Sequence, residues 1–388
     1  MTVSVAFASA ALAAWLYLIF ARGGFWRADM REEREASPEP QVWPRVVAVV
    51  PARNEADVIA ESLGSLLQQD YPGSFEVILV DDQSTDATAA NARAAAARLL
   101  RPERLVVVEG EPLPQGWAGK LWAMKQGVDH AGSQPKRPDY LLFTDADIAF
   151  APDALRHLVS HAEARDTVLT SWMVKLRCES LAERGLIPAF VFFFQMLYPF
   201  AWVNRPDNET AAAAGGCMLV RRDALTQAGG IEAIRNALID DCALGERLKS
   251  VGPVWLGLTE RAHSLRPYPD VGDIRRMVAR SAYDQLGYSP LVLAGVALAM
   301  TLIFLLPPLY AVFGTGLAQS FGALAWVLMA FAFQPILRFY RLSPLWGLAL
   351  PAIAALYLMF TLDSAYQYMR GRGGLWKGRV QARRIEGQ

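Results

Sequence analysis

The stretch Tyr140-Leu-Leu-Phe-Thr-Asp-Ala-Asp147 decides the predicted fold, because two carboxylates directly follow an apolar run. The apolar residues predict a buried strand. Side chains two positions apart on a strand point to the same side, so we expect Asp145 and Asp147 to face one pocket at the carboxyl end of the strand. Two close like charges favour a cation or a proton between them. A metal ion that carries a diphosphate would meet this need, and a solvated surface pair is the alternative.

Strands and helices alternate around this stretch. Apolar, β-branched runs predict further strands at 45–52, 76–82 and 105–110. Helical spacing predicts helices from Ile59 to about Tyr71, after Asp86, at 118–131 and from about Pro152. Alternation of this kind predicts an α/β fold, in which a mainly parallel sheet carries helices on both faces.

Acidic residues recur at the carboxyl ends of the predicted strands. Glu55 follows the first strand, Asp81 and Asp82 end the second, and Asp145 and Asp147 end the fourth. Ligands bind at this edge of open α/β sheets. Neighbouring residues of a strand face opposite sides, so only one of Asp81 and Asp82 should reach a ligand, where it would accept hydrogen bonds from uracil or ribose. The alternative for this pair is a turn that caps the next helix.

The segment 238–252 (LIDDCALGERLKSVG) predicts a helix whose first turn contains Asp240 and Asp241. The helix dipole favours the charged form of such acids. A fixed, ionised carboxylate suits a general base that removes a proton from a hydroxyl group. The alternative is two capping acids without chemistry. Gly215 and Gly216 would let a bulky ligand approach the backbone, or they form an ordinary turn.

Two basic residues are candidates for phosphate binding. Lys120 lies near the start of a predicted helix, and Arg280 precedes the late apolar segments. Each would meet phosphate as a positive charge, and each has a solvated surface charge as its alternative; Arg280 could also meet lipid headgroups. No G-x-G-x-x-G follows the first strand, and the spacing Gly116–Lys120 is too short for a P-loop. His157 and His161 lack the glutamate of a zinc motif.

Apolar segments near both ends predict a membrane protein. Residues 2–20 carry no charge and are about long enough to cross a bilayer. Arginines follow this segment, and the positive-inside rule places the next residues in the cytoplasm. Three later apolar segments predict further spans, or alternatively buried core helices: 290–313, 317–337 and 344–363. Three late crossings would put the basic tail outside, so one segment, for example the one with Pro307 and Pro308, is expected to be re-entrant or interfacial, and the number of crossings stays open.

These patterns divide the chain into five predicted parts: a transmembrane helix at 1–24, a linker at 25–44, a cytosolic α/β domain at 45–284, transmembrane helices at 285–365 and a basic tail at 366–388. Segment 186–203 is apolar enough to span a membrane but lies inside the α/β part. We expect it to lie in the membrane interface where a lipid enters, or to be a buried core helix. The net charge of zero indicates no nucleic-acid partner.

The order of the motifs carries more information than any one of them. PARNEADVI, VILVDDQSTDAT, GWAGKLWAMKQG, FTDAD, GGCMLVRR and DDCALGERL, between about Val46 and Arg280, resemble the family 2 inverting glycosyltransferases with the GT-A fold. The resemblance implies a nucleotide-sugar donor, with Mg²⁺ or Mn²⁺ as cofactor. For the donor, it implies that the uridine part is bound by Pro51, Ala52, Glu55 and Asp82, that Lys120 lies near the nucleotide and that Asp145 contacts it. It implies that Asp147 binds the metal ion. For the acceptor, it implies that Gly215, Gly216 and Asp240 border the site and that Asp241 is the general base.

Processive and ceramide-type members of this family carry Q-x-x-R-W or R-x-x-R-W, of which Met277–Ser281 keeps only Arg280. This difference argues against a polymer synthase. GWAGKLWA, AAAAGGCML and RPYPDVGDIRRMVARSAYDQLGYSP resemble the hopanoid-biosynthesis-associated membrane glycosyltransferases of bacteria. That resemblance implies a multi-pass protein of the bacterial inner membrane that transfers a sugar to a lipid hydroxyl group. A polysaccharide synthase and a non-catalytic membrane scaffold of the same fold are the alternatives.

Overall fold

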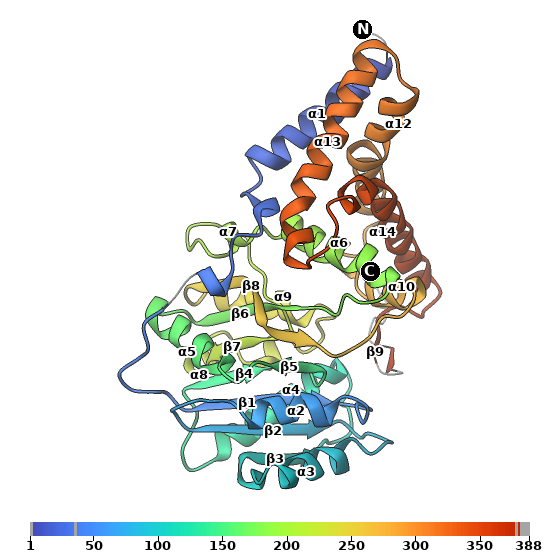
Figure 1. Ribbon diagram of the computed structural model, residues 1–388. Helices are drawn as coiled ribbons and strands as arrows, with labels where there is room; N and C mark the ends of the chain where they lie inside the picture. Colours follow the sequence, from blue (N-terminus) through green and yellow to red (C-terminus); the bar gives the residue numbers. More distant parts are fainter. Residues whose placement is uncertain (1–2, 35–36, 377–378, 381–388) are drawn as a thin grey trace.

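The computed structural model describes residues 3–34, 37–376 and 379–380. Eight strands form one sheet in the order β3-β2-β1-β4-β7-β6-β8-β5, in the lower half of Figure 1. The strands are β1 (Val46–Ala52), β2 (Phe75–Asp81), β3 (Leu105–Glu109), β4 (Tyr140–Phe143), β5 (Ile148–Phe150), β6 (Leu169–Lys175), β7 (Met218–Arg221) and β8 (Val254–Ser264). A two-stranded antiparallel pair, β9 (Leu375–Trp376) and β10 (Arg379–Val380), stands apart.

Helices connect the strands and form a bundle beside the sheet (Figure 1). They are α1 (Val3–Phe20), α2 (Ile59–Leu67), α3 (Thr88–Arg98), α4 (Gly119–Ser133), α5 (Ala154–Arg165), α6 (Leu181–Leu197), α7 (Phe200–Val203), α8 (Arg222–Gln227), α9 (Asp240–Lys249), α10 (Val271–Ala279), α11 (Pro290–Met300), α12 (Leu306–Phe313), α13 (Gly316–Phe339) and α14 (Trp346–Met369).

The predicted α/β fold is confirmed. β1 pairs in parallel with β2 and β4, and β2 pairs in parallel with β3, so the carboxyl ends of these strands meet at one edge. β7 runs antiparallel to β4 and β6, which makes the sheet mixed. Alternate residues of β1 enter two cores: Val47 and Val49 face the side with α4, whereas Val46, Ala48 and Val50 face the side with α2.

A glycine lets α4 lie close to the sheet. A Cβ atom added to Gly127 would stand 2.4 Å from Cγ1 of Val49 and 3.2 Å from Cγ2 of Val80. Such a contact is shorter than packed carbon atoms allow. The close approach fixes the height of α4 over β1 and β2, and therefore the position of Lys120 at its amino end.

The prediction that one strand carries both Asp145 and Asp147 is wrong. β4 ends at Phe143, and the chain turns before β5 begins at Ile148. Thr144, the first residue after β4, donates its hydroxyl hydrogen to the carbonyl oxygen of Gly216. Alternation of side chains along a strand therefore does not orient the two acids.

Five helical segments are long and apolar enough to cross a membrane: α1, α6 with α7, α11 with α12, α13 and α14. The three late segments that the sequence predicts are therefore helices. α11 and α12 form one continuous rod through a π-helical turn at Thr301–Leu305, just before Pro307 and Pro308. Local widening of this kind accommodates a proline inside a helix.

The two ends of α14 contact different helices, α13 and α10. Near its start, Trp326 Nε1, close to the middle of α13, donates to the Leu348 carbonyl oxygen. Near its end, Ser364 Oγ donates to the Ala279 carbonyl oxygen in α10, and Asp363 lies 3.2 Å from Arg275. In Figure 1, α1, α12 and α13 extend to the end of the bundle that is far from the sheet, whereas α14 stays near α6 and α10.

Segment 186–203 lies mainly in α6, between the bundle and the sheet (Figure 1). Ser180 and Glu183 form a capping box that starts this helix. Most of its side chains are buried, and Tyr357 of α14 donates its hydroxyl hydrogen to the Leu186 carbonyl oxygen. The packing matches the alternative of a buried helix, which here joins the bundle to the α/β part.

The predicted linker at 25–44 is tied to the rest of the fold. The Phe25 ring is buried against Phe192 of α6, with ring centroids 5.2 Å apart. The carboxylate of Glu32 receives two hydrogen bonds from Arg261 Nη1, at 2.6 and 2.7 Å. This segment therefore fixes the end of α1 relative to β8. Of the predicted basic tail, Lys377, Arg383 and Arg384 lie outside the described residues.

Candidate active site

Several predicted site residues meet at the carboxyl edge of β1, β2 and β4. Pro51 and Ala52 end β1 and are buried. Glu55 follows them and is also buried. Asp82 follows β2 and is fully buried, with Oδ2 at 3.8 Å from Nη1 of Arg53. The structure thus brings the four residues predicted to bind the nucleoside to one edge.

Lys120 connects two carboxylates from different parts of the chain. Its Nζ lies 2.8 Å from Asp145 Oδ1 and 2.9 Å from Asp240 Oδ2. Burial alone would lower the pKa of this lysine, but the two neighbouring carboxylates outweigh burial and raise that pKa well above its usual value. Lys120 is therefore a charged internal residue of the site, and the alternative of a solvated surface charge is wrong.

Asp147 has a partner that sequence reasoning missed. Nε of Arg266 lies 2.9 Å from Asp147 Oδ2, and Nη2 of the same guanidinium lies 2.5 Å from Glu55 Oε2. Burial raises the pKa of Asp145, Lys120 lowers it, and the charge of Asp147 raises it further. A different cation therefore pairs with each of the two acids, Lys120 with Asp145 and Arg266 with Asp147.

Asp241 is held by two backbone amides. The Gly215 amide donates to Oδ2 at 2.9 Å, and the Cys242 amide donates to Oδ1 at 2.8 Å. Burial, followed by the charge of Asp240, raises the pKa of Asp241 to about 6, although Lys120 acts in the opposite direction. The helix dipole favours the charged form of Asp241, as predicted from the sequence, but desolvation of the carboxylate is the largest effect and raises the pKa.

The two glycines of the GGCML segment differ in their surroundings. A Cβ atom on Gly215 would lie 3.2 Å from Asp241 Oδ2 and 3.3 Å from Lys120 Nζ. A Cβ atom on Gly216 would instead stand 2.8 Å from Cγ2 of Val174 in β6. Gly215 therefore borders the acidic residues, whereas Gly216 packs against the sheet.

Arg280 is exposed at the carboxyl end of α10. Burial raises the pKa of the Tyr268 phenol to about 12, and the charge of Asp147 adds to this effect. The charges of Arg266 and Arg280 oppose it. The charges of Asp147, the candidate metal ligand, and of Arg280 both act on the Tyr268 phenol. Arg280 is therefore within electrostatic range of the site.

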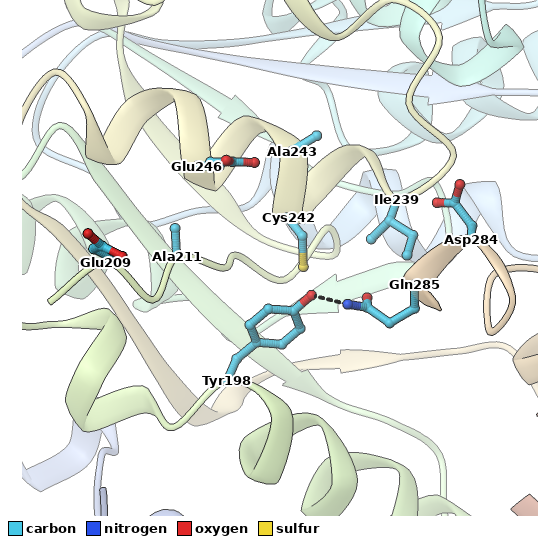
Figure 2. A pocket seen from close by; sticks show the side chains of 9 residues that line it. All are labelled: Tyr198, Glu209, Ala211, Ile239, Cys242, Ala243, Glu246, Asp284 and Gln285. Carbon is cyan, nitrogen blue, oxygen red and sulfur yellow. Dashed lines mark hydrogen bonds between the residues drawn. The ribbon is translucent and has the colours of Figure 1, made fainter. Parts of the chain in front are cut away.

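A pocket of about 360 Å³ is lined by Cys242, the residue that follows Asp241, although Asp241 itself is not among the lining residues. Figure 2 shows Tyr198 from the end of α6 below Cys242, and its hydroxyl oxygen accepts a 2.6 Å hydrogen bond from Gln285 Nε2. Three carboxylates line the pocket, and its described lining contains no Lys, Arg or His. The lining residues are Tyr198, Glu209, Ala211, Ile239, Cys242, Ala243, Glu246, Asp284 and Gln285. Gln285 precedes the start of α11 by five residues, so the pocket lies near a candidate span.

Asp145 and Asp147 could supply only part of the ligands that a divalent cation needs. Among the described residues, no group of three or more His, Cys, Asp or Glu side chains is arranged to hold a metal ion. Mg²⁺ commonly takes one or two protein carboxylates and completes its shell with water and substrate phosphates. Asp147, with Asp145 nearby, fits that mode once Arg266 releases its oxygen.

The comparisons with known proteins agree with this geometry. Residues 47–229 match the model of glycosyl transferase family 2. The match covers just under half of the chain, so residues 47–229 are similar to a family 2 glycosyltransferase domain. The matched residues include β1, apart from Val46, the strands β2 to β7 and every site residue from Pro51 to Gly216. Asp240, Asp241, Arg266 and Arg280 lie beyond the matched end.

Two individual proteins show partial likeness. The 4,4'-diaponeurosporenoate glycosyltransferase of Staphylococcus aureus (strain MRSA252) is 36% identical over 113 residues, which are 29% of this chain. The match spans about a quarter of that relative, 26% of its length. The mannosyltransferase PcManGT from Pyrobaculum calidifontis, solved with GDP-Man and Mn²⁺, has a TM-score of 0.56 and 21% identity. It covers 94% of this chain and 99% of its own, which confirms the GT-A-like fold outside the matched domain as well.

Proposed function

We propose that this protein is a membrane-bound inverting glycosyltransferase that moves a sugar from a nucleotide sugar to a lipid hydroxyl group. One observation carries the proposal. Asp241 is a half-buried carboxylate whose pKa is raised to about 6, and it lies near Lys120, which also pairs with Asp145 and Asp240. A pKa in this range suits a general base at neutral pH.

The donor would bind at the carboxyl edge of β1, β2 and β4. Glu55 would accept hydrogen bonds from the nucleoside, and Pro51 and Ala52 would pack against it. Asp82 is fully buried and would have to become exposed before it could accept a hydrogen bond from the nucleoside. We propose a UDP-linked sugar, from the resemblance of these segments to nucleotide-sugar enzymes. PcManGT, which shares the fold, was solved with GDP-Man, so the test includes both nucleotides.

Asp147 would hold Mg²⁺ or Mn²⁺ together with the donor phosphates. The metal, when bound, would offset the negative charge that develops on the leaving diphosphate. Lys120 would remain beside Asp145 and stabilise the same charge from within the protein. Arg280 would reach the diphosphate from the end of α10, where it is exposed.

Asp241 would act on the acceptor. Its carboxylate would take the proton of the acceptor hydroxyl group as that oxygen forms a bond to the anomeric carbon. The bond from the anomeric carbon to the diphosphate breaks at the same time, and the diphosphate leaves with the electron pair. Attack from the face opposite the leaving group inverts the anomeric centre. The hydrogen bonds from Gly215 and Cys242 orient the carboxylate for this step.

The pocket lined by Cys242 supports a hydroxyl group as the acceptor rather than a phosphate. Glu209, Glu246 and Asp284 would repel an anionic headgroup, whereas carboxylates accept hydrogen bonds from hydroxyl groups. The pocket is close to the start of α11, where a lipid within the bilayer could reach it. A hopanoid or another isoprenoid lipid fits this position, and the name of the S. aureus relative also supports a lipid acceptor.

The bundle suggests three membrane crossings. α1, the α11–α12 rod and α13 would cross the bilayer, whereas α14, with both ends near α10 and α13, would stay on the side of the sheet. The tail would then return to the side of the α/β domain. This arrangement agrees with the positive-inside rule and removes the conflict over the basic tail. We propose that this side is the cytoplasm of a bacterial inner membrane.

The test uses purified protein in lipid nanodiscs with Mn²⁺, UDP- and GDP-linked sugars and a bacterial lipid extract. One sugar added to a lipid by the wild type, with transfer lost in Asp241→Asn, would support the proposal. A long product would instead indicate a polysaccharide synthase. Absence of both transfer and nucleotide binding would favour a non-catalytic scaffold.

A further inference from the structure

We infer that Arg266 is an internal counter-ion of Asp147 that a nucleotide diphosphate displaces, so that nucleotide binding opens the metal site. This inference deepens the proposed function and rests on its assignment of Asp147. It concerns a residue beyond the matched family 2 domain, which ends at residue 229.

The guanidinium of Arg266 lies between two acids with separate proposed roles. It is 2.9 Å from Oδ2 of Asp147, the candidate metal ligand, and 2.5 Å from Oε2 of Glu55, a candidate nucleoside ligand. Ser264 also faces that Asp147 oxygen, at 3.4 Å. A cation that approached Asp147 would therefore meet a positive charge already at its oxygen.

The backbone around Arg266 is fixed on both sides. The Leu265 amide donates to the Asp147 carbonyl oxygen at 2.8 Å, and the Tyr268 amide donates to Glu183 Oε1 at 2.7 Å. Glu183 belongs to the capping box of α6. With the loop held at both ends, only the side chain of Arg266 is left to change partner. Its side chain is 29% exposed, so solvent and ligands can reach it.

Exchange of partners is favourable when a diphosphate arrives. The planar guanidinium binds phosphate oxygens in a two-pronged geometry, as it binds carboxylates. A diphosphate carries more negative charge than the Asp147 carboxylate alone and would draw Arg266 toward itself. Asp147 then has no counter-ion, and the phosphate oxygens of the nucleotide lie next to its carboxylate. The site becomes attractive to a divalent cation only in this state, so nucleotide and metal should bind cooperatively.

The experiment measures free Mn²⁺ by electron paramagnetic resonance with full-length protein in nanodiscs of neutral lipid. We compare Mn²⁺ affinity without nucleotide, with UDP and with GDP. In the wild type, nucleotide should tighten Mn²⁺ binding by about tenfold or more, a typical coupling between two sites. In Arg266→Gln, Mn²⁺ alone should bind at least about tenfold more tightly than in the wild type, because a charge a few ångströms away has been removed.

Arg261→Gln is the matched control. Arg261 lies in β8, five residues before Arg266, and also pairs with acids, Glu32 and Asp153, but outside the site. This variant should keep the wild-type coupling between nucleotide and Mn²⁺. Arg266→Lys keeps the charge without the two-pronged geometry and should retain weak Mn²⁺ binding in the absence of nucleotide.

Two results would overturn the inference. The first is that the wild type binds Mn²⁺ with the same affinity in the presence and in the absence of a nucleotide that is shown to bind. This measurement uses the wild type only and does not depend on the folding of a variant. The other is unchanged Mn²⁺ affinity in a folded Arg266→Gln protein. Both leave the proposed sugar transfer untouched. If neither UDP nor GDP binds at all, the proposed function fails, and the Mn²⁺ affinity of Arg266→Gln still tests the role of Arg266.

Discussion

The backbone amide of Gly215 donates a 2.9 Å hydrogen bond to Oδ2 of Asp241. The donor lies in the segment before β7 and the acceptor lies in the first turn of α9, so two distant parts of the chain fix one carboxylate. A side chain at position 215 would crowd this contact, since its Cβ atom would stand 3.2 Å from the acceptor oxygen.

Gly215→Ala should therefore impair transfer more than stability. The new methyl group would push Asp241 or Lys120 by a few tenths of an ångström, and we expect transfer to fall by about tenfold, because small misplacements of reacting groups are costly. Steady-state transfer and the thermal unfolding midpoint are measured together. Full activity with an unchanged midpoint would show that Gly215 does not border the reacting groups.

The pH dependence of transfer should report Asp241. Its pKa is raised to about 6, and a base acts in its deprotonated form. We expect kcat/KM to rise as pH increases toward 6 and to level off above it. Lys120 lowers the pKa of Asp241, so the residual activity of Lys120→Gln should have its rising limb at higher pH. A limb that stays in place or moves to lower pH would contradict this arrangement of charges.

The close approach of α4 to the sheet predicts a difference between two alanine variants. Gly127→Ala would place Cβ at 2.4 Å from Val49, and overpacking of this kind costs about 1–3 kcal/mol in unfolding free energy. Gly132→Ala on the same helix meets no atom within 4 Å and should be neutral or slightly stabilising, by up to about 1 kcal/mol. Denaturant unfolding of the two variants measures the difference. Equal stabilities would mean that α4 lies farther from β1.

The course of α14 predicts the location of the chain ends. If α14 does not cross the bilayer, a fluorescent protein fused after Gln388 should fluoresce in the cytoplasm. Alkaline phosphatase inserted between Gly314 and Thr315, in the turn from α12 to α13, should be active outside. A dark carboxyl-terminal fusion that is produced in full length would favour an additional crossing by α14.

The sequence predicted the edge of the sheet correctly but not the orientation of its acids. Runs such as Val46–Ala52 identify strands because buried parallel strands are continuously apolar. The partners of Asp145 and Asp147 come from α4 and from the end of β8, and only the tertiary fold brings Lys120 and Arg266 to them. The RPYPD segment was visible in the sequence, but no local pattern assigns an arginine to a carboxylate 119 residues away.

Two further features depend on burial, which local sequence does not specify. Hydropathy identified α14 as a long apolar helix, but only its contacts with α10 and α13 distinguish a crossing helix from one that stays on one side. The helix dipole predicted an easily ionised Asp241, whereas desolvation raises its pKa. The raised pKa comes from the packing around Asp241, and the contacts of α14 support its proposed place on one side of the membrane.

Transfer of a sugar from a nucleotide sugar to a lipid hydroxyl group, compared between the wild type and Asp241→Asn, tests the central claim most directly. The wild type should add one sugar per acceptor, and the variant should lose at least about a hundredfold in rate, as expected when a general base is removed. Nucleotide and Mn²⁺ binding should be retained, because Asp241 contacts neither in the proposed arrangement. Unchanged transfer by a folded Asp241→Asn protein would contradict the account.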